Sequence, residues 1–301
     1  MAAIDLGTQT ALMLIARERA GELEVLEDHC FGCGLGRGQG VEGALLSESV
    51  ERTLEVLETF ARRAGESGVA TQRQRVVGTA VLRRARPVEP FLTAVRARTG
   101  WSLEVLEEAE EARLGWSAAV AAGAPPETCV IDVGGGSSEC VTDAGASRRS
   151  VPIGAVVLTQ RFLGLDGREP TESGGFEGLV AEARRHAREL PRADGADLVL
   201  LGGTASNLAC LELGLEVFDH RVAEGVEVPA TAALEWAQRI LALDEGDRLD
   251  LPIEPDRAAI LPAGLAALGA VLEQVAGSEV RARVTGRGLR YGLARELLGL
   301  S

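Results

Sequence analysis

Lysine is absent from this chain of 301 residues, so all 31 of its basic side chains are arginines. The planar guanidinium of arginine suits phosphate oxygens, because it offers several N–H donors in a fixed plane. Acidic residues number 45, and the formal net charge of −14 argues against a surface that attracts polyanions in general. A ligand made of phosphates would therefore need positive charge concentrated in a cleft.

Aromatic residues are also scarce, at 3% of the chain. Proteins bind single-stranded nucleic acid largely by stacking bases on aromatic rings, so we expect no nucleic-acid partner. No apolar run approaches the roughly 18 residues of a membrane span, and the N-terminus enters Ile4-Asp5 without a signal peptide. The five cysteines are scattered and odd in number, which favours reduced thiols. We therefore expect a cytoplasmic protein with no membrane partner.

One short motif occurs twice. Residues 4–10 read Ile-Asp-Leu-Gly-Thr-Gln-Thr, and residues 131–138 read Ile-Asp-Val-Gly-Gly-Gly-Ser-Ser. Each copy is an apolar run that ends in Asp, followed by glycine and small hydroxylated residues, which predicts a strand, a tight turn and a returning strand. Such a turn directs N–H groups and hydroxyls at one point, which suits a phosphate. The Asp suits Mg²⁺, because hard cations prefer oxygen ligands. Two copies predict two lobes that close on a phosphorylated substrate.

Each motif also has a structural interpretation. An Asp-x-Gly turn alone is common without a ligand, whereas three consecutive glycines at 134–136 are best explained by close approach of the backbone to a ligand. Gly202-Gly203-Thr204 could hold a phosphate at a helix N-terminus, or it could serve close packing of a helix on the sheet. Glu110-Glu111 and Arg83-Arg84, taken alone, favour solvent-exposed charge.

Strands and helices alternate through both halves, which predicts an α/β protein with two similar mixed sheets flanked by helices. We expect an N-terminal lobe at 1–118, carrying the first turn, and a C-terminal lobe at 119–301, carrying the second. Beyond the two turns, the predicted strands are 11–17, 22–27, 74–79, 102–106, 128–133, 138–142, 198–201 and 279–284. The predicted helices are 47–65, 88–99, 108–122, 155–163, 173–190, 229–243, 257–275 and one from about 288.

Read together, these segments resemble the exopolyphosphatase / guanosine pentaphosphate phosphohydrolase family, within the superfamily of actin, sugar kinases and heat-shock chaperone ATPases. The resemblance covers essentially the whole chain and keeps the motifs in the expected order. It implies a two-lobed actin-like (ribonuclease H-like) fold with the active site in the interlobe cleft, and a homodimer. The motifs that carry it are Asp5 to Thr10, Thr79 to Arg83, Glu110 to Arg113, Ile131 to Glu139, Gly202 to Thr204, Arg257 to Gly264 and Gly286 to Leu289.

The resemblance implies a role for each candidate site residue. Glu111 falls on the catalytic glutamate, the general base that would deprotonate the attacking water. The implied Mg²⁺ ligands are the carboxylates Asp5, Asp132 and Glu139. The implied phosphate-binding residues are Thr8, Gln9, Thr10, Arg83, Gly134, Gly135, Gly136, Ser137, Gly202, Gly203 and Thr204.

The function expected from this resemblance is Mg²⁺-dependent exopolyphosphatase activity on inorganic polyphosphate. Guanosine pentaphosphate is the alternative substrate, because it presents a phosphate chain to the same loops. A non-catalytic sensor of polyphosphate or nucleotide is a third possibility, since Glu107-Glu108 replace the family's usual Ser-Gly. Two extra carboxylates would disfavour an anion and raise the pKa of the base. A sugar- or acetate-type kinase shares the superfamily fold, but nothing in the sequence indicates an acceptor pocket.

Overall fold

The computed structural model describes residues 1–40, 42–142, 146–219 and 221–300. The chain divides into two compact units. Unit 1 contains Met1–Ala118 and the C-terminal segment from Leu289, and unit 2 is Ala119–Gly288. The C-terminal helix thus belongs to unit 1, whereas the sequence had placed everything after residue 118 in the second lobe.

Unit 1 is built on a mixed sheet with the strand order β3-β2-β1-β4-β5. β1 pairs antiparallel with β2, and β2 pairs antiparallel with β3. β1 and β4, and then β4 and β5, are parallel. The strands are β1 (Ala2–Leu6), β2 (Thr10–Arg19), β3 (Glu22–Gly32), β4 (Gln74–Gly78) and β5 (Leu103–Val105).

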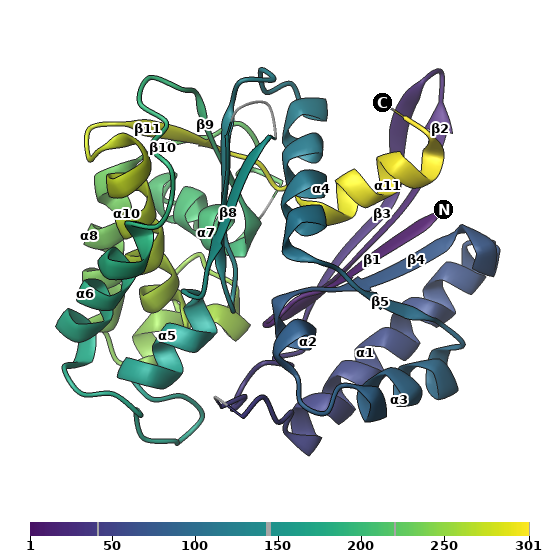
Figure 1. Ribbon diagram of the computed structural model, residues 1–301, viewed down its shortest axis with the longest axis horizontal. Coiled ribbons are helices and arrows are strands. Elements are labelled where there is room, and N and C mark those ends of the chain that lie inside the picture. Colours follow the sequence, from purple (N-terminus) through teal and green to yellow (C-terminus); the bar gives the residue numbers. More distant parts are fainter. Residues whose placement is uncertain (41, 143–145, 220, 301) are drawn as a thin grey trace. The chain divides into compact units, whose positions relative to one another are not determined.

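Helices cover both faces of this sheet (Figure 1). Because successive side chains of a strand point to opposite faces, Ile4 of β1 packs with the apolar side of α1 and α3. Its neighbour Ala3 packs with Leu114 of α4 and Leu293 of α11 on the other face. The helices of unit 1 are α1 (Ser47–Glu66), α2 (Ala80–Arg84), α3 (Glu89–Thr99), α4 (Glu108–Ala121) and α11 (Leu289–Leu298).

Unit 2 repeats this plan. Its strand order is β10-β11-β9-β6-β7-β8, so that β8-β7-β6-β9-β11 corresponds to β3-β2-β1-β4-β5, with β10 added at the edge. The strands are β6 (Cys129–Val133), β7 (Ser138–Thr142), β8 (Ser147–Val151), β9 (Leu198–Leu201), β10 (Glu227–Pro229) and β11 (Arg281–Val284). The helices are α5 (Ala155–Phe162), α6 (Gly175–Ala187), α7 (Gly202–Glu212), α8 (Ala230–Leu241), α9 (Glu245–Leu249) and α10 (Leu261–Ala276). The predicted α/β architecture of two similar mixed sheets flanked by helices is confirmed.

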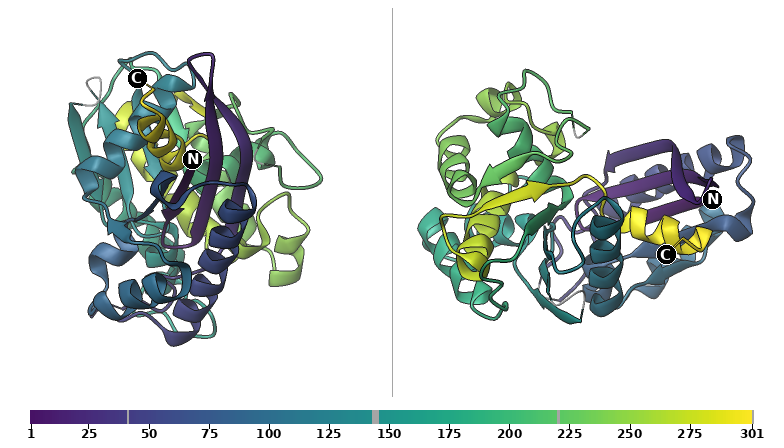
Figure 2. Two further views of the ribbon diagram at one scale, coloured as in Figure 1. Left: turned by 90° about the vertical axis from the view of Figure 1, so that its right-hand side faces the viewer. Right: turned by 90° about the horizontal axis from the view of Figure 1, so that it is seen from above.

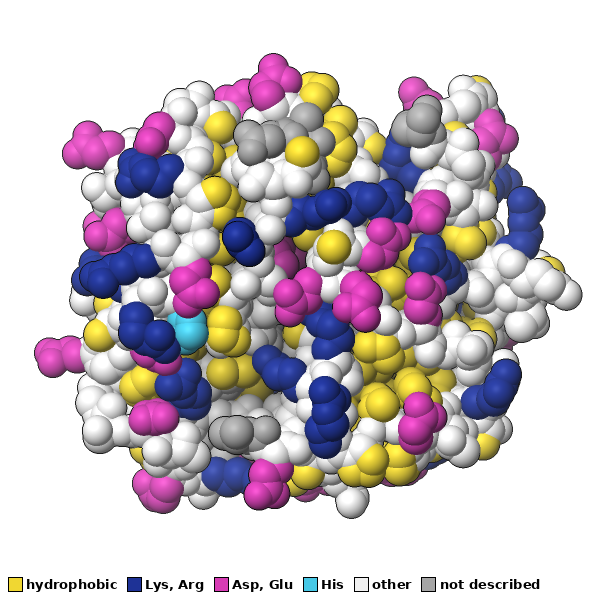
Figure 3. All heavy atoms as spheres, viewed as in Figure 1, with side chains coloured by type: hydrophobic (Ala, Val, Ile, Leu, Met, Phe, Trp, Pro, Cys, Tyr) yellow, Lys and Arg dark blue, Asp and Glu magenta, His cyan; other side chains and the backbone are white. Residues whose placement is uncertain are grey.

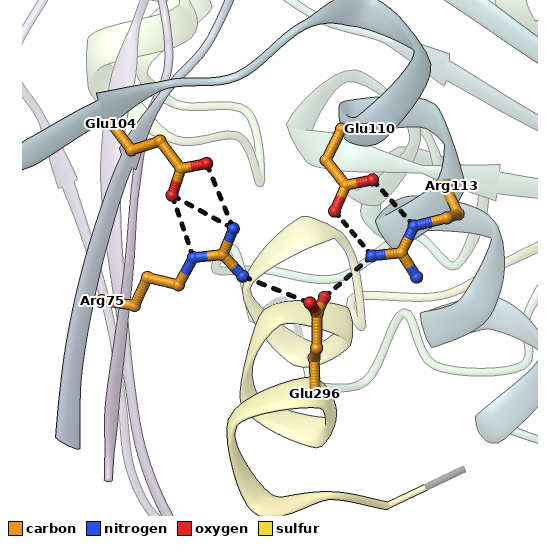
Figure 4. Close-up of polar contacts among 5 residues, drawn as sticks. All are labelled: Arg75, Glu104, Glu110, Arg113 and Glu296. Carbon is orange, nitrogen blue, oxygen red and sulfur yellow. Dashed lines mark hydrogen bonds and ion pairs between the residues drawn. The ribbon is translucent and has the colours of Figure 1, made fainter.

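The C-terminal helix α11 lies beside the strands of unit 1 in both Figure 1 and Figure 2. Its apolar side, Leu289 and Leu293, is buried with Leu114 of α4. Its polar side carries Glu296, which bridges arginines of β4 and α4 in the ion-pair network of Figure 4. Burial on one side and charge pairing on the other explain why this helix returns to unit 1.

Some predicted boundaries differ from the structure. The helix predicted at 257–275 is a 3₁₀ turn (Pro255–Arg257) followed by α10, which starts at Leu261 with proline in its first turn. Proline is favoured there because the first N–H groups of a helix have no partner within it. The strand predicted at 22–27 continues to Gly32, paired with β2. In the described part of the chain, no helix combines the length and apolar character needed to span a bilayer.

Candidate active site

Three connections of unit 1 meet at one edge of its sheet, where the parallel strands end. The first glycine turn follows β1, α2 follows β4, and α4 follows β5. The Thr79 N–H donates to the Leu6 carbonyl at 3.2 Å, and the Leu106 N–H donates to the Gly78 carbonyl at 2.9 Å. Unit 2 is built alike, with the second glycine turn after β6 and Gly202 after β9. Open α/β sheets bind ligands at such an edge.

The second glycine turn lies against the start of α5. The Ala155 N–H donates to the Gly134 carbonyl at 2.9 Å. The Val156 N–H donates to the Gly135 carbonyl, also at 2.9 Å. Because the C=O and N–H of a trans peptide point in opposite directions, the N–H groups of Gly135 and Gly136 are turned away from α5. The turn thereby presents backbone donors as an anion site requires.

This close approach depends on Gly154, the residue before α5. A Cβ at Gly154 would come 2.5 Å from backbone atoms of both Gly135 and Gly136. The turn itself is closed by the Gly134 N–H, which donates to the Ser137 carbonyl at 3.0 Å. The turn is therefore stabilised by its own hydrogen bond and by its contact with the start of α5.

Two predicted magnesium ligands face each other across the strands that flank this turn. Asp132 on β6 pairs with Glu139 on β7 in the antiparallel register, so their side chains project from the same face of the sheet. Glu139 is buried and accepts a hydrogen bond from the Ser150 hydroxyl at 2.9 Å. The Asp132 carboxylate lies over Gly202, where a Cβ would come 2.5 Å from Oδ1 and φ is +85°. Only glycine fits there without strain.

These two carboxylates suit Mg²⁺, which binds one or two carboxylates and completes its shell with water and phosphate oxygens. Within residues 1–40, 42–142, 146–219 and 221–300, no three His, Cys, Asp or Glu side chains group as a metal site. Asp5, the third predicted ligand, is a buried residue of β1 in unit 1. Oxygens of the substrate and of water would have to supply the other positions.

The third predicted turn, Gly202-Gly203-Thr204, begins α7. The Thr204 hydroxyl donates to the Val133 carbonyl at 2.9 Å, which ties α7 to the end of β6. A Cβ at Gly203 would come 2.1 Å from Nη2 of Arg257. Glycine at 203 thus makes room for the Arg257 guanidinium beside the start of α7.

The first glycine turn is held by a different segment in a similar way. In the glycine-dense segment 33–36, the Gly36 N–H donates to the Thr8 carbonyl and the Gly34 N–H donates to the Gln9 carbonyl, each at 2.9 Å. The N–H groups of Gln9 and Thr10 are therefore turned away from that segment. The Gln9 side chain, which is 3% exposed, accepts a hydrogen bond from Arg37 Nε at 3.2 Å.

The predicted base, Glu111, lies in the first turn of α4. Its Oε2 accepts a hydrogen bond from Arg83 Nη1 at 2.6 Å, and the two side chains are only 17% and 16% exposed. Burial raises the pKa of the Glu111 carboxyl, Arg83 opposes that rise, and the Glu108 charge adds to it. The net result is a pKa above the ordinary range, as suits a general base. The solvent-exposed interpretation of this acidic run is wrong for Glu111.

Comparisons with known proteins identify the family of this chain. A sequence profile described as the Ppx/GppA phosphatase family matches residues 14–300. The chain belongs to the Ppx/GppA phosphatase family. A family member from Aquifex aeolicus is 28% identical, with a TM-score of 0.76 over 99% of this chain and 97% of that one. A type II structural variant of the Aquifex aeolicus phosphatase is 26% identical, with a TM-score of 0.71 over 99% and 98%.

The fold is also shared with an exopolyphosphatase from Cytophaga hutchinsonii, at 21% identity and a TM-score of 0.81 over 100% of this chain and 98% of that one. The resemblance drawn from the sequence motifs is confirmed by the family match. The Ppx/GppA family is a family of phosphohydrolases, which supports hydrolase activity for this chain.

Sequence reasoning missed the buried polar group around Arg257 of this Ppx/GppA chain. Arg257, treated as the start of a helix that packs in the core, is 6% exposed and pairs with Glu254. The Glu254 N–H donates to Asn207 Oδ1, and Asn207 Nδ2 donates to the Gly203 carbonyl, each at 2.8 Å. The set holds the start of α7. The sequence feature that could have indicated this ion pair is a glutamate three residues before an arginine.

The two acidic residues that depart from the family pattern are placed differently. Glu108 Oε1 lies 4.0 Å from Arg83 Nη2, at the edge of the Arg83–Glu111 pair. The Glu107 carbonyl accepts the N–H groups of Glu110 and Glu111, each at 3.0 Å, and so caps the start of α4. Figure 3 shows acidic and basic side chains interspersed over the face in view.

Proposed function

We propose that this Ppx/GppA protein is a magnesium-dependent exopolyphosphatase that releases orthophosphate from the ends of inorganic polyphosphate. The second glycine turn supports the proposal best. Its N–H groups at Gly135 and Gly136 are turned away from α5, and the turn joins the two strands on which Asp132 faces Glu139. Backbone donors beside carboxylates suit a phosphate with its metal ion.

In this proposal Glu111 is the general base. It accepts a proton from the attacking water as the water oxygen bonds to the terminal phosphorus and the bridging P–O bond breaks. The products are orthophosphate and a chain shorter by one phosphate. Little covalent chemistry is required, so positioning and charge stabilisation dominate the rate.

The glycine turns hold phosphate oxygens. Gly134–Gly136 and the Ser137 hydroxyl hold the terminal phosphate, and Thr8–Thr10 hold a neighbouring one. The N–H groups at the start of α7, in Gly202-Gly203-Thr204, are a further phosphate contact of the kind that helix N-termini provide. Asp132 and Glu139 would hold Mg²⁺, which when bound neutralises phosphate charge. Asp5 is the corresponding candidate carboxylate of unit 1.

The test is phosphate release from long-chain polyphosphate and from guanosine pentaphosphate, measured side by side with Mg²⁺. Glu111→Gln should lower kcat by at least about 100-fold, whereas Glu55→Gln, an equal charge change at an exposed position of α1, should leave it unchanged. A wild-type rate no higher than that of Glu111→Gln on both substrates would sink the proposal. The ratio of kcat/KM values assigns the preferred substrate.

Two further expectations from the sequence remain proposals. A homodimer predicts a mass of twice 31.5 kDa by light scattering. A cytoplasmic location predicts recovery of the native protein in the cytosolic fraction of cells. Binding of polyphosphate in calorimetry without turnover would instead favour a sensor.

A further inference from the structure

We propose that Arg83 is a positioning residue for Glu111, which orients the carboxylate of the base by direct contact and does not bind a substrate phosphate. The proposal rests on the proposed function, because it concerns how Glu111 serves as the base. It reassigns Arg83, which the family resemblance had placed among the phosphate ligands.

The first observation is how the donors of Arg83 are used. Nη1 donates to the Leu106 carbonyl at 2.8 Å and to Glu111 Oε2 at 2.6 Å, which accounts for both hydrogens on that nitrogen. Nη2 has less than 1 Å² of exposed surface and no hydrogen-bond partner in the part of the chain that the structure describes. A phosphate could reach neither nitrogen without displacing Glu111 or opening the surrounding packing.

The second observation is the anchor. Leu106 follows β5, and its N–H is bonded to the Gly78 carbonyl at the end of β4. The sheet therefore anchors Leu106 through the peptide that precedes it, and Arg83 donates to the carbonyl of this same residue. Arg83 starts from α2, whose N–H groups at Leu82 and Arg83 donate to the Thr79 carbonyl. Two rigid points thus fix the guanidinium, and the guanidinium fixes one oxygen of Glu111.

The third observation is the charge around the pair. The groups that act on Glu111 are Arg83 from α2 and Glu108 from its own helix. Glu108 Oε1 is 4.0 Å from Nη2, so the outer side of the guanidinium faces an acid that would repel a phosphate. Without Arg83, burial and Glu108 would both favour protonated Glu111, and a protonated carboxyl cannot accept a proton from water.

The experiment compares Arg83→Gln and Arg83→Lys with the wild type, using Arg84→Gln on the same helix as the matched control. kcat and KM for polyphosphate are measured from acid to neutral pH. For Arg83→Gln we expect kcat to fall by about 100-fold and KM to change by less than about twofold. The acid limb of the pH profile of kcat should move to higher pH. In Arg83→Lys the acid limb should lie between those of Arg83→Gln and the wild type, because the lysine charge can reach Glu111 but cannot bridge to Leu106. Arg84→Gln should leave the limb in place.

The opposite pattern overturns the proposal: a KM raised about tenfold or more with the acid limb unmoved, as removal of a ligand that binds ground and transition states alike would give. A second readout needs no turnover. Carboxyl ¹³C resonances of labelled glutamate, assigned with Glu111→Gln, should show Glu111 titrating at higher pH in Arg83→Gln and Arg83→Lys than in the wild type. An unmoved titration in both variants rejects the positioning role even if the protein proves not to hydrolyse polyphosphate. If the wild type is inactive but the titration of Glu111 moves in the two Arg83 variants, only the proposed function is rejected.

Discussion

Gly292 of α11 lies directly on the backbone of Leu114 in α4: a Cβ at Gly292 would come 2.2 Å from the Leu114 carbonyl oxygen. Backbone cannot move aside as a side chain can, so even one methyl group separates the two helices. This contact joins the C-terminal helix to the helix that carries Glu111.

Gly292→Ala should therefore destabilise the protein by about 1–3 kcal/mol, the range for overpacking a close contact. Urea unfolding measures the loss. Gly288→Ala is the matched control, because a Cβ there meets no heavy atom within 4 Å and its φ is not positive. Equal stabilities of the two variants would show that α11 and α4 can separate without cost.

The ion pairs at the other end of α11 make a weaker contribution. Glu296 Oε2 accepts from Arg113 Nη2 at 2.8 Å, and Oε1 lies 3.6 Å from Arg75 Nη1 (Figure 4). The three side chains are between 24% and 45% exposed, so solvent screens the pairs.

Glu296→Gln should lower the free energy of unfolding by no more than about 1 kcal/mol at low salt, and most of that difference should vanish in 1 M NaCl. Urea unfolding at both salt concentrations provides the test, with the exposed Glu279→Gln as the control for net charge. A loss that persists in 1 M NaCl would indicate a packing role for Glu296.

The parts of the fold that are local in sequence could be predicted from the sequence. A strand, a glycine turn and a returning strand lie within about ten residues, so both copies of the repeat were found. The place of α11 depends on contacts such as that of Arg290 with Asp28, at 2.7 Å and 262 positions apart. A periodic pattern in the sequence cannot indicate a contact between residues so far apart, and for this reason α11 was assigned to the wrong unit.

The candidate site was predictable to the same extent. Its glycines and carboxylates follow strand ends and could be seen as a pattern. Glu111 could not, because its burial depends on Arg83 and Leu106, which reach it through the pairing of β4 with β5. Only the family resemblance assigned it a role.

Glu108 gives a prediction about pH. Its negative charge raises the pKa of Glu111, so removing that charge should lower the pKa and keep the base ionised in more acidic solution. For Glu108→Gln we expect the acid limb of kcat to move to lower pH, opposite to the shift expected for Arg83→Gln. The pH profile of phosphate release measures this, with Glu55→Gln as the charge-matched control. A limb that moves equally in both variants would mean that only net charge matters.

Gly154 tests whether the second glycine turn binds substrate. In Gly154→Ala the new methyl group must displace the backbone of Gly135 and Gly136, from which it would be 2.5 Å away. That displacement turns the N–H groups from their present direction, so kcat/KM for polyphosphate should fall by about 100-fold, as when one preorganised donor is lost. The titration of Glu111 in unit 1 should stay unchanged. Gly288→Ala again serves as the control, and circular dichroism establishes that both variants are folded. Full activity in a folded Gly154→Ala protein would remove the second turn from the proposed phosphate site.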